Sequence, residues 1–238
     1  MEEPRLGSVL EKGRIVRATL RFVASVLITS GALMLLDAGL TLAWQEPISA
    51  YLAQRQQDRL GHELDAASVK RLVRQEELAV ASIRDMKKRI AKLAGIERRR
   101  AGKGHPIGRI ELPTLHRDYV VVQGTDETTL RKGPGHYPGT DFPGEGGTMA
   151  IAGHRTTYLA PFRTIDQLKA GDRIVLKMPY GTFTYSVEKT QVVSPNALWI
   201  THDVKGEERL VLSACHPLYS ASHRIVAFAK LTAEAESP

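Results

Sequence analysis

The sequence predicts a mainly β domain, a sandwich or a closed barrel, that follows a membrane-spanning helix and a helical stalk. Three observations support this prediction. An apolar segment near the N-terminus is long enough to cross a membrane, a middle section is rich in helix-forming residues, and the remainder alternates short β-rich runs with turns. The 238 residues are enough for one substantial domain and an appendage.

The apolar segment is Phe22–Trp44, "FVASVLITSGALMLLDAGLTLAW". As a helix it can cross the ~30 Å hydrocarbon core, and Trp44 at its far end suits the water interface. Basic residues before it favour a cytoplasmic N-terminus with the bulk of the chain outside. The run is longer than a usual signal-peptide core, and no clear small-x-small site precedes "QEP". We therefore expect an uncleaved signal anchor.

Asp37 is the one carboxylate within this apolar segment. A carboxylate near the bilayer centre costs about 2.5–3.5 kcal/mol on insertion scales. Asp37 is either a pairing or relay residue or a residue near the outer interface of a slightly shifted span. No partner charge lies in the segment, which favours the interface.

The middle section, residues 45–100, has few turn signals and predicts a helical stalk. In its second half apolar residues recur at steps of three and four, with Glu76 as an interruption. These residues are Val69, Leu72, Ala79, Ile83, Met86, Ile90 and Leu93. The pattern fits weak self-association through a short coiled coil, or a helix that lies against the main domain, which is the more common arrangement.

A charge run followed by Gly and Pro, "ERRRAGKGHP", indicates a linker and a domain boundary. The predicted organisation is a basic cytoplasmic tail (1–21), the anchor (22–44), the stalk (45–100), the linker (101–107), a β domain (108–232) and a C-terminal tail (233–238).

Seven runs in the β domain are typical of strands: "GRIEL", "DYVVV", "TMAIAGH", "DRIVLKM", "GTFTYSVEKTQVV", "RLVLSAC" and "RIVAFAKL". A closed barrel would remove the exposed edges of such a sheet. Two short helices fit between the strands, one from near Asp126 to "KGPG" and one over Phe162–Leu168. The pattern contains no ββα repeat and no βαβ alternation.

The net charge of +7 raises the question of nucleic acid or anionic lipid as a partner. The basic residues are spread over tail and stalk without interleaved aromatic residues, which argues against nucleic-acid binding.

The chain has a single cysteine, so an intramolecular disulfide and a Cys-based zinc site are excluded. Cys215 follows the apolar run Arg209–Ser213 and precedes a His-Pro turn. Arg224 begins the next run, which returns a cation near the thiol. From these residues alone, a thiol exposed beside a cation and an inert buried cysteine are about equally compatible with the sequence.

Three stretches taken together resemble a sortase, the cysteine transpeptidase that attaches proteins to Gram-positive cell walls. They are "GPGHYPGTDFPGEGGTMAIAGHRTTY", "PFRTIDQLKAGDRIVL" and "LVLSACHPLYSASHRIVAF". The "AGHRTTY" and "CHP" blocks and the anchor end "DAGLTLAWQEP" are most similar to class E sortases of high-GC bacteria. The resemblance covers roughly residues 108–231 and implies a closed eight-stranded β-barrel. It also implies that Cys215 is the nucleophile, His154 the general acid/base and Arg224 the oxyanion-stabilising group.

The resemblance further implies a substrate class and partners. The expected reaction cleaves an LAxTG-like sorting signal between Thr and Gly and transfers the secreted protein to a peptidoglycan precursor amine, at the outer face of the cell membrane. Tyr137 is expected to read the second residue of the signal. Two alternatives remain, a thiol hydrolase of the same peptides and a non-catalytic anchored scaffold that binds a peptide.

One position departs from the family motif, which ends in Thr-Cys. Ala214 stands where the threonine is expected, so a hydroxyl beside the substrate is missing, and we expect an altered contact there. Ser213 cannot replace that hydroxyl, because neighbouring strand residues face opposite sides. The catalytic trio itself is intact.

The remaining titratable residues predict no cofactor. His216 is expected to point away from the thiol as part of the turn, and a turn role is also favoured for His136. The other histidines show no ligand-like clustering, and Asp141 with Glu145 is weak ground for calcium. We therefore expect no metal site.

Overall fold

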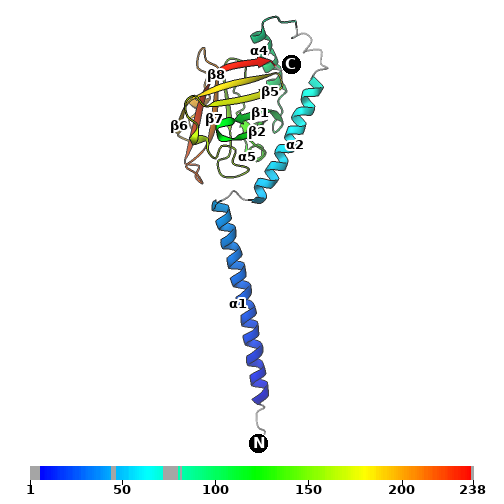
Figure 1. The fold of residues 1–238 in the computed structure, drawn as a ribbon, viewed down its shortest axis with the longest axis vertical. Helices are drawn as coiled ribbons and strands as arrows, with labels where there is room; N and C mark the ends of the chain where they lie inside the picture. Colours follow the sequence, from blue (N-terminus) through cyan, green and yellow to red (C-terminus); the bar gives the residue numbers. More distant parts are fainter. Residues whose placement is uncertain (1–5, 44–46, 72–79, 81, 237–238) are drawn as a thin grey trace. The chain divides into compact units, whose positions relative to one another are not determined.

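The computed structural model describes residues 6–43, 47–71, 80 and 82–236, in two units that comprise residues 1–47 and 48–238. The first unit contains the long helix α1 (Leu6–Ala43; Figure 1). Within it, the 25 residues Val16–Leu40 have a mean hydropathy of 1.8 and none is buried inside the protein. This segment is long and apolar enough to cross a membrane, and Asp37 lies in its last turn. Trp44 lies outside the described residues.

The second unit is built on a closed barrel with the strand order β1-β2-β3-β4-β7-β8-β6-β5. The strands are β1 (Pro106–Leu112), β2 (Arg117–Gln123), β3 (Gly135–His136), β4 (Thr148–Ala152), β5 (Arg173–Met178), β6 (Gly181–Val193), β7 (Arg209–His216) and β8 (His223–Glu236). The pairs β2–β3 and β4–β7 are parallel. The mainly β fold and the closed eight-stranded barrel are confirmed. The sequence runs correspond to all strands except β3, which is two residues long.

Alternation along the strands separates two apolar clusters. Leu210, Leu212 and Ala214 of β7 belong to the main core inside the barrel, together with large buried rings such as Phe183 and Tyr185. A smaller outer-face cluster lies on the opposite side of these strands. Its members are Ala150, Val193, Ile200, Val211, Val226 and Phe228.

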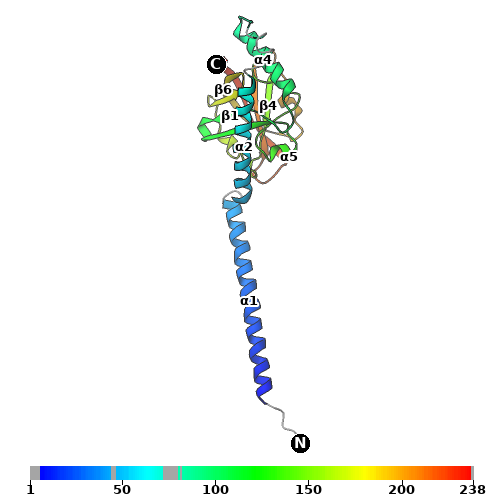
Figure 2. The ribbon, with the colours of Figure 1, turned by 90° about the vertical axis from the view of Figure 1, so that its right-hand side faces the viewer.

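In its described residues, the section predicted as a stalk contains the helices α2 and α4, and both contact the barrel. Figure 2 looks onto the first, α2 (Pro47–Arg71), in front of β1. Leu60 and Leu64 of α2 pack against Val120 and Val122 of β2. The polar side chain of Gln57 is buried, and two hydrogen bonds to the backbone compensate for the loss of water. Its Oε1 accepts from Val120 N at 2.7 Å, and its Nε2 donates to Lys132 O at 2.6 Å.

The second helix is α4 (Met86–Arg100), which Asp85 caps by accepting a hydrogen bond from Lys88 N. Ile90 is fully buried, and its Cγ2 would lie 2.4 Å from a Cβ placed at Gly144, so only glycine permits this close approach. Leu93 also packs against the main core. The last two residues of the predicted coiled-coil seam, Ile90 and Leu93, thus pack against the barrel of the same chain. Leu72 and Ala79 of that seam lie outside the described residues.

The short elements follow local chemistry. Asp126 caps α5 (Glu127–Leu130) by accepting from Thr129 N, and hydrogen bonds from the Thr128 and Thr129 hydroxyls lower the pKa of Asp126. The described residues of this unit also form the 3₁₀ turns η1 (Pro113–Leu115), η2 (Ile165–Gln167) and η3 (Leu198–Thr201). β8 continues past residue 232 to Glu236, which pairs with Gly181 of β6, so residues 233–236 are strand rather than tail.

Candidate active site

The register of β7 and β8 places Arg224 directly opposite Cys215. Residues opposite each other in an antiparallel pair project from the same face with Cβ atoms about 4.5–5.5 Å apart. Cys215 is a free, half-buried thiol. The Arg224 guanidinium is held by two bonds from Nη1, to Ala221 O and His223 O, both at 3.0 Å. The cation expected near the thiol from the sequence therefore shares a face with it.

His154 reaches the same place from β4, which runs parallel to β7. Ala152 is paired with Ser213, and Gly153 N donates to Ser213 O at 3.0 Å. Continuing this register by two residues brings His154 level with Cys215. The structure thus places the three predicted residues at one end of three neighbouring strands, β4, β7 and β8.

The His154 ring is half-buried and lies 5.1 Å, between ring centroids, from Tyr158. Burial lowers the pKa of His154, the Arg131 cation lowers it further, and Glu127 opposes both. Its Nε2 is buried and has no hydrogen-bond partner among the described residues. An unsatisfied buried ring nitrogen is uncommon in a folded protein and is suited to exchanging a proton with a bound reactant.

The backbone around His154 is tightly constrained. A Cβ at Gly153 would lie 2.5 Å from the Phe162 ring, so a larger residue does not fit before the histidine. Phe162 N donates to His154 O at 3.1 Å and closes the following loop. Within that loop Tyr158, Leu159 and Ala160 have φ values of 50°, 66° and 40°. Three consecutive left-handed residues other than glycine store backbone strain, a feature that concentrates at functional sites.

The structure adds one contact that the sequence did not indicate. The Arg155 side chain is 3% exposed, and its Nη1 lies 2.8 Å from Nδ1 of His216. His216 therefore turns toward the segment that follows His154, although its place beside the thiol predicted only a turn role. No spacing rule connects these two residues, which are 61 positions apart.

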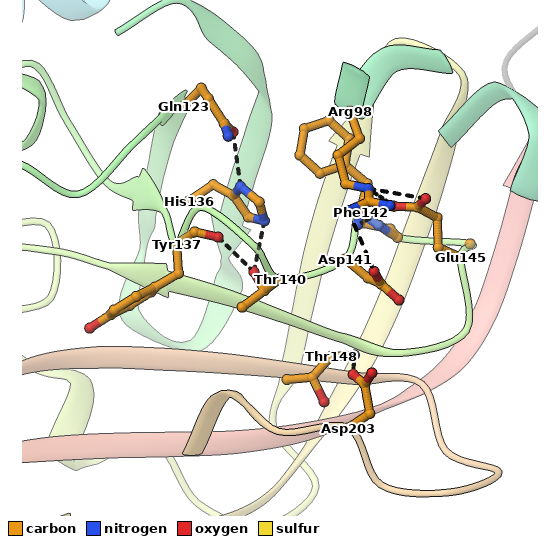
Figure 3. A network of polar contacts seen from close by, with 12 residues as sticks. Arg98, Gln123, His136, Tyr137, Thr140, Asp141, Phe142, Glu145, Thr148 and Asp203 are labelled. Atoms are coloured by element: carbon orange, nitrogen blue, oxygen red, sulfur yellow. Dashed lines mark hydrogen bonds and ion pairs between the residues drawn. The ribbon is translucent and has the colours of Figure 1, made fainter. Parts of the chain in front are cut away.

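Tyr137 lies on the outer face of the barrel, near β4. Its N donates to Ala150 O at 2.9 Å, and its half-buried ring packs against the outer-face cluster. Figure 3 shows the ring directed away from His136 and Thr140. Its neighbour His136 is fully buried between Gln123 Oε1 and Thr140 Oγ1, each 2.8 Å from a ring nitrogen. Burial lowers the pKa of His136 to about 4, so at neutral pH a neutral imidazole fixes this turn.

Ala214 lies inside the barrel. It is 3% exposed and belongs to the main core, whereas Cys215 next to it is half-buried on the other face. The side chain of Ser213 is also buried. A contact between substrate and Ala214 stays a prediction, and its burial offers that contact no access from solvent.

The carboxylates considered for calcium have structural partners at the other end of β4 (Figure 3). Glu145 accepts from Phe142 N at 2.8 Å and pairs with Arg98 at 2.8 Å. Asp141 lies 4.0 Å from Arg98, and its pKa is raised first by burial and then by Glu145 and Asp203. The described residues contain no group of three or more His, Cys, Asp or Glu arranged to hold a metal ion.

In a comparison with known protein families, the model described as the sortase domain matches residues 110–232, a range that contains Cys215, His154 and Arg224. Sortase D of Bacillus subtilis is 36% identical over 114 residues, which cover 48% of this chain and 56% of that protein. Sortase SrtE1 of Streptomyces coelicolor is 28% identical over 146 residues, which cover 55% of this chain and 42% of that protein. The chain thus spans about half the length of these curated relatives.

Solved structures resemble the barrel. Sortase E from Streptomyces avermitilis matches with a TM-score of 0.53 and 30% identity, over 57% of this chain and 93% of that one. A Clostridium perfringens sortase D5 transpeptidase, at 24% identity and a TM-score of 0.53, covers 62% and 99% and shows likeness of fold.

Proposed function

Because this chain belongs to the sortase family, we propose that it is a membrane-anchored cysteine transpeptidase whose catalytic residues are Cys215, His154 and Arg224. The observation that carries the proposal is the strand register, which brings these three residues to one end of β4, β7 and β8. A thiol, an imidazole and a guanidinium are the groups that amide cleavage through a thioester requires.

The first half-reaction forms a thioester. The Cys215 thiolate attacks the carbonyl carbon of the scissile peptide bond, and the C=O electrons move to oxygen. Arg224, which stays charged, stabilises that oxyanion. The intermediate collapses as the C–N bond breaks, and His154 supplies the proton that lets the amine leave. The lowered pKa of His154 makes its imidazolium a stronger acid toward that nitrogen.

The second half-reaction restores an amide. An acceptor amine attacks the thioester, gives its proton to His154, and expels the Cys215 thiolate. In the sortase family this amine belongs to a peptidoglycan precursor and the acyl group to a secreted protein. If water takes the place of the amine, the product is a free carboxylate and the enzyme is a hydrolase.

Substrate choice rests on Tyr137, as part of an LAxTG-like preference with cleavage between Thr and Gly. Tyr137 lies beside Ala150, which is paired with Val211, four residues before Cys215 and thus about 13 Å along the strand. The second residue of an extended signal lies roughly 7 Å upstream of the scissile threonine. The Tyr137 ring therefore has to span only the difference between these two distances along the strand. Its phenolic oxygen can accept the backbone N–H of alanine, a donor that proline lacks.

We expect LAxTG peptides to exceed LPxTG peptides in kcat/KM, by up to ~1–3 kcal/mol for an unpaired buried group. Tyr137→Phe should narrow that gap and spare the LPxTG rate, with Tyr51→Phe on α2 as the control. If both peptides lose equally in Tyr137→Phe, the tyrosine is a packing residue and does not select the substrate.

The anchor proposal is an N-terminus in the cytoplasm, a single span within α1 and the catalytic unit outside. It is supported by the Val16–Leu40 span and the basic residues on its N-terminal side. Protease added to intact cells should digest the part after residue 44 and spare the Arg-rich tail. The opposite protection would contradict this orientation.

The deciding experiment is mass spectrometry of the protein mixed with an LAxTG peptide and an amine. A mass increase at Cys215 equal to the acyl fragment excludes the non-catalytic scaffold, and the ratio of transferred to hydrolysed product separates transpeptidase from hydrolase. Cys215 that alkylates readily with iodoacetamide but never acylates would contradict the proposed function.

A further inference from the structure

Arg155 carries a buried charge beside the proposed acid/base. Its side chain is 3% exposed, and each of its three nitrogens has a partner. Nη2 pairs with Asp166 at 2.7 Å, Nη1 donates to His216 Nδ1 at 2.8 Å, and Nε donates to Arg163 O at 3.2 Å. A buried guanidinium is tolerated when its charge is paired and its donors are satisfied, and Arg155 meets both conditions.

These partners come from the segments that carry the proposed catalytic residues. Arg155 directly follows His154, and His216 directly follows Cys215. Arg163 and Asp166 lie in the connection between β4 and β5. The Arg155 guanidinium therefore joins the segment after β4 to the last residue of β7.

A second contact links the same two regions at the surface. Arg163 Nη2 donates to the Tyr219 hydroxyl at 3.4 Å, and its guanidinium carbon lies 5.9 Å from the centroid of that ring. Tyr219 belongs to the loop between β7 and β8, so the connection after β4 contacts both the last residue of β7 and the loop that follows it.

The Arg155–His216 bond has a defined polarity. Arginine has donors and no acceptor, so His216 Nδ1 must carry the lone pair, and the proton of the neutral ring sits on Nε2. A lysine presents its donors from a single nitrogen and cannot reproduce the planar fork that reaches three partners.

We propose that Arg155 is a positioning residue that fixes the spacing between the segment after β4 and the end of β7, and thereby keeps His154 within reach of the Cys215 thiol and the leaving amine. The inference rests on the proposed transpeptidase function. A displacement of about 1 Å at a reacting group can cost roughly 10²-fold in rate. Loss of the Arg155–His216 hydrogen bond should accordingly lower the acylation rate and leave the KM for the peptide largely unchanged.

The test compares single-turnover acylation by Arg155→Met, His216→Leu and the double variant, together with melting temperatures. Each single variant should lose about 10- to 100-fold in acylation rate at a temperature where it is folded. The double variant should lose no more than the worse single one, because both remove the same bond. His216→Asn should recover much of the His216→Leu loss, since its Oδ1 stands where Nδ1 accepts. Arg109→Met, which removes the ion pair between Arg109 of β1 and Asp118 of β2, serves as the control.

An Arg155→Met variant within twofold of the wild-type acylation rate would overturn the proposal, and so would losses that multiply in the double variant. A ¹⁵N spectrum of His216 tests the contact without any reaction. The wild type should show an unprotonated Nδ1, and Arg155→Met should lose this fixed tautomer. A protonated Nδ1 in the wild type would contradict the hydrogen bond from Arg155 to His216. A wild-type protein that forms no thioester but shows the fixed tautomer contradicts the proposed function instead.

Discussion

The two ends of β4 differ in how completely their polar groups are satisfied. At the first residue, Thr148 N donates to Asp203 Oδ1 at 2.7 Å, and the hydroxyl donates to His202 O at 3.1 Å. Glu145 has partners there too, and Glu208 accepts from Gly144 N at 2.6 Å (Figure 3 shows Glu145 and Asp203). Beyond the last residue, His154 Nε2 is buried without a hydrogen-bond partner among the described residues, and the register of β4 and β7 places His154 level with the free thiol of Cys215.

The backbone shows the same difference. The loop before β4 reaches its positive φ values at glycines 139, 144 and 146, where they carry no steric penalty, whereas the loop after His154 places Tyr158, Leu159 and Ala160 in the left-handed region. The end at Thr148 therefore has the dense bonding that stabilises a fold, although Arg209 Nε there is buried without a hydrogen-bond partner among the described residues and lies 3.8 Å from a Glu207 carboxylate oxygen. The other keeps unused bonding capacity and strain, which a substrate can exploit.

The largest effect should come from Cys215→Ala. The chain contains no second thiol, so both peptide cleavage and transfer should disappear. The melting temperature should change little because the thiol is half-buried and unpaired. Chromatography of the peptide products together with thermal denaturation checks both statements. Residual cleavage above the uncatalysed rate would remove Cys215 from its proposed role.

Arg224→Ala should have the next largest effect. The loss of one oxyanion donor costs roughly 10²–10³-fold in kcat. Arg224→Lys should fall between this variant and the wild type, since it keeps the charge but loses the planar fork. Steady-state kinetics with a fluorogenic peptide measure the series, with Arg173→Ala on β5 as the surface control. A normal kcat in Arg224→Ala would place the stabilising charge elsewhere.

A smaller effect, on stability, is expected at the Thr148 end of β4, where Glu208 accepts from Gly144 N. Burial is the main cause that raises the pKa of Glu208, and the bond from Gly144 N opposes it. The folded state therefore binds the Glu208 proton more tightly than the unfolded state, whose pKa is about 4.5. The contribution of this proton to stability is complete below pH 4.5 and is lost as pH rises through the folded pKa.

Glu208→Gln keeps an acceptor for Gly144 N and cannot ionise. The melting temperature of this variant minus that of the wild type should therefore increase from acidic to neutral pH, while peptide cleavage stays close to wild type. A difference that decreases over this range would show that the ionised carboxylate itself stabilises the loop before β4.

The barrel could be predicted because its strands are β-rich runs bounded by Gly, Pro and Asp. β3 escaped notice because two residues within "GPGHYPG" leave no alternation to detect. The helices of the stalk were evident from composition. The contact between Ile90 and Gly144 was not evident, since a seam of apolar residues predicts that a helix face is buried but not which residues cover it.

The candidate site was predictable only in part. Cys215, His154 and Arg224 came from family motifs, and the strand register then explains why residues so far apart in sequence converge. The Arg155–His216 bond had no sequence signal, because a long-range side-chain contact leaves no periodic pattern. The left-handed run at Tyr158 lacked the Gly or Asn that usually marks such a conformation.

A paired measurement distinguishes the C-terminal end of β4, where the chemistry is proposed, from its N-terminal end, where the bonding is structural. Single-turnover acylation and melting temperature are compared for His154→Gln and Asp203→Ala. His154→Gln should lose roughly 10²–10⁴-fold in rate with little change in melting temperature. Asp203→Ala leaves the buried Thr148 N unpaired and should lose about 1–3 kcal/mol of stability while keeping its rate. A lost acylation rate in Asp203→Ala together with a normal rate in His154→Gln would show that the chemistry lies at the other end of β4.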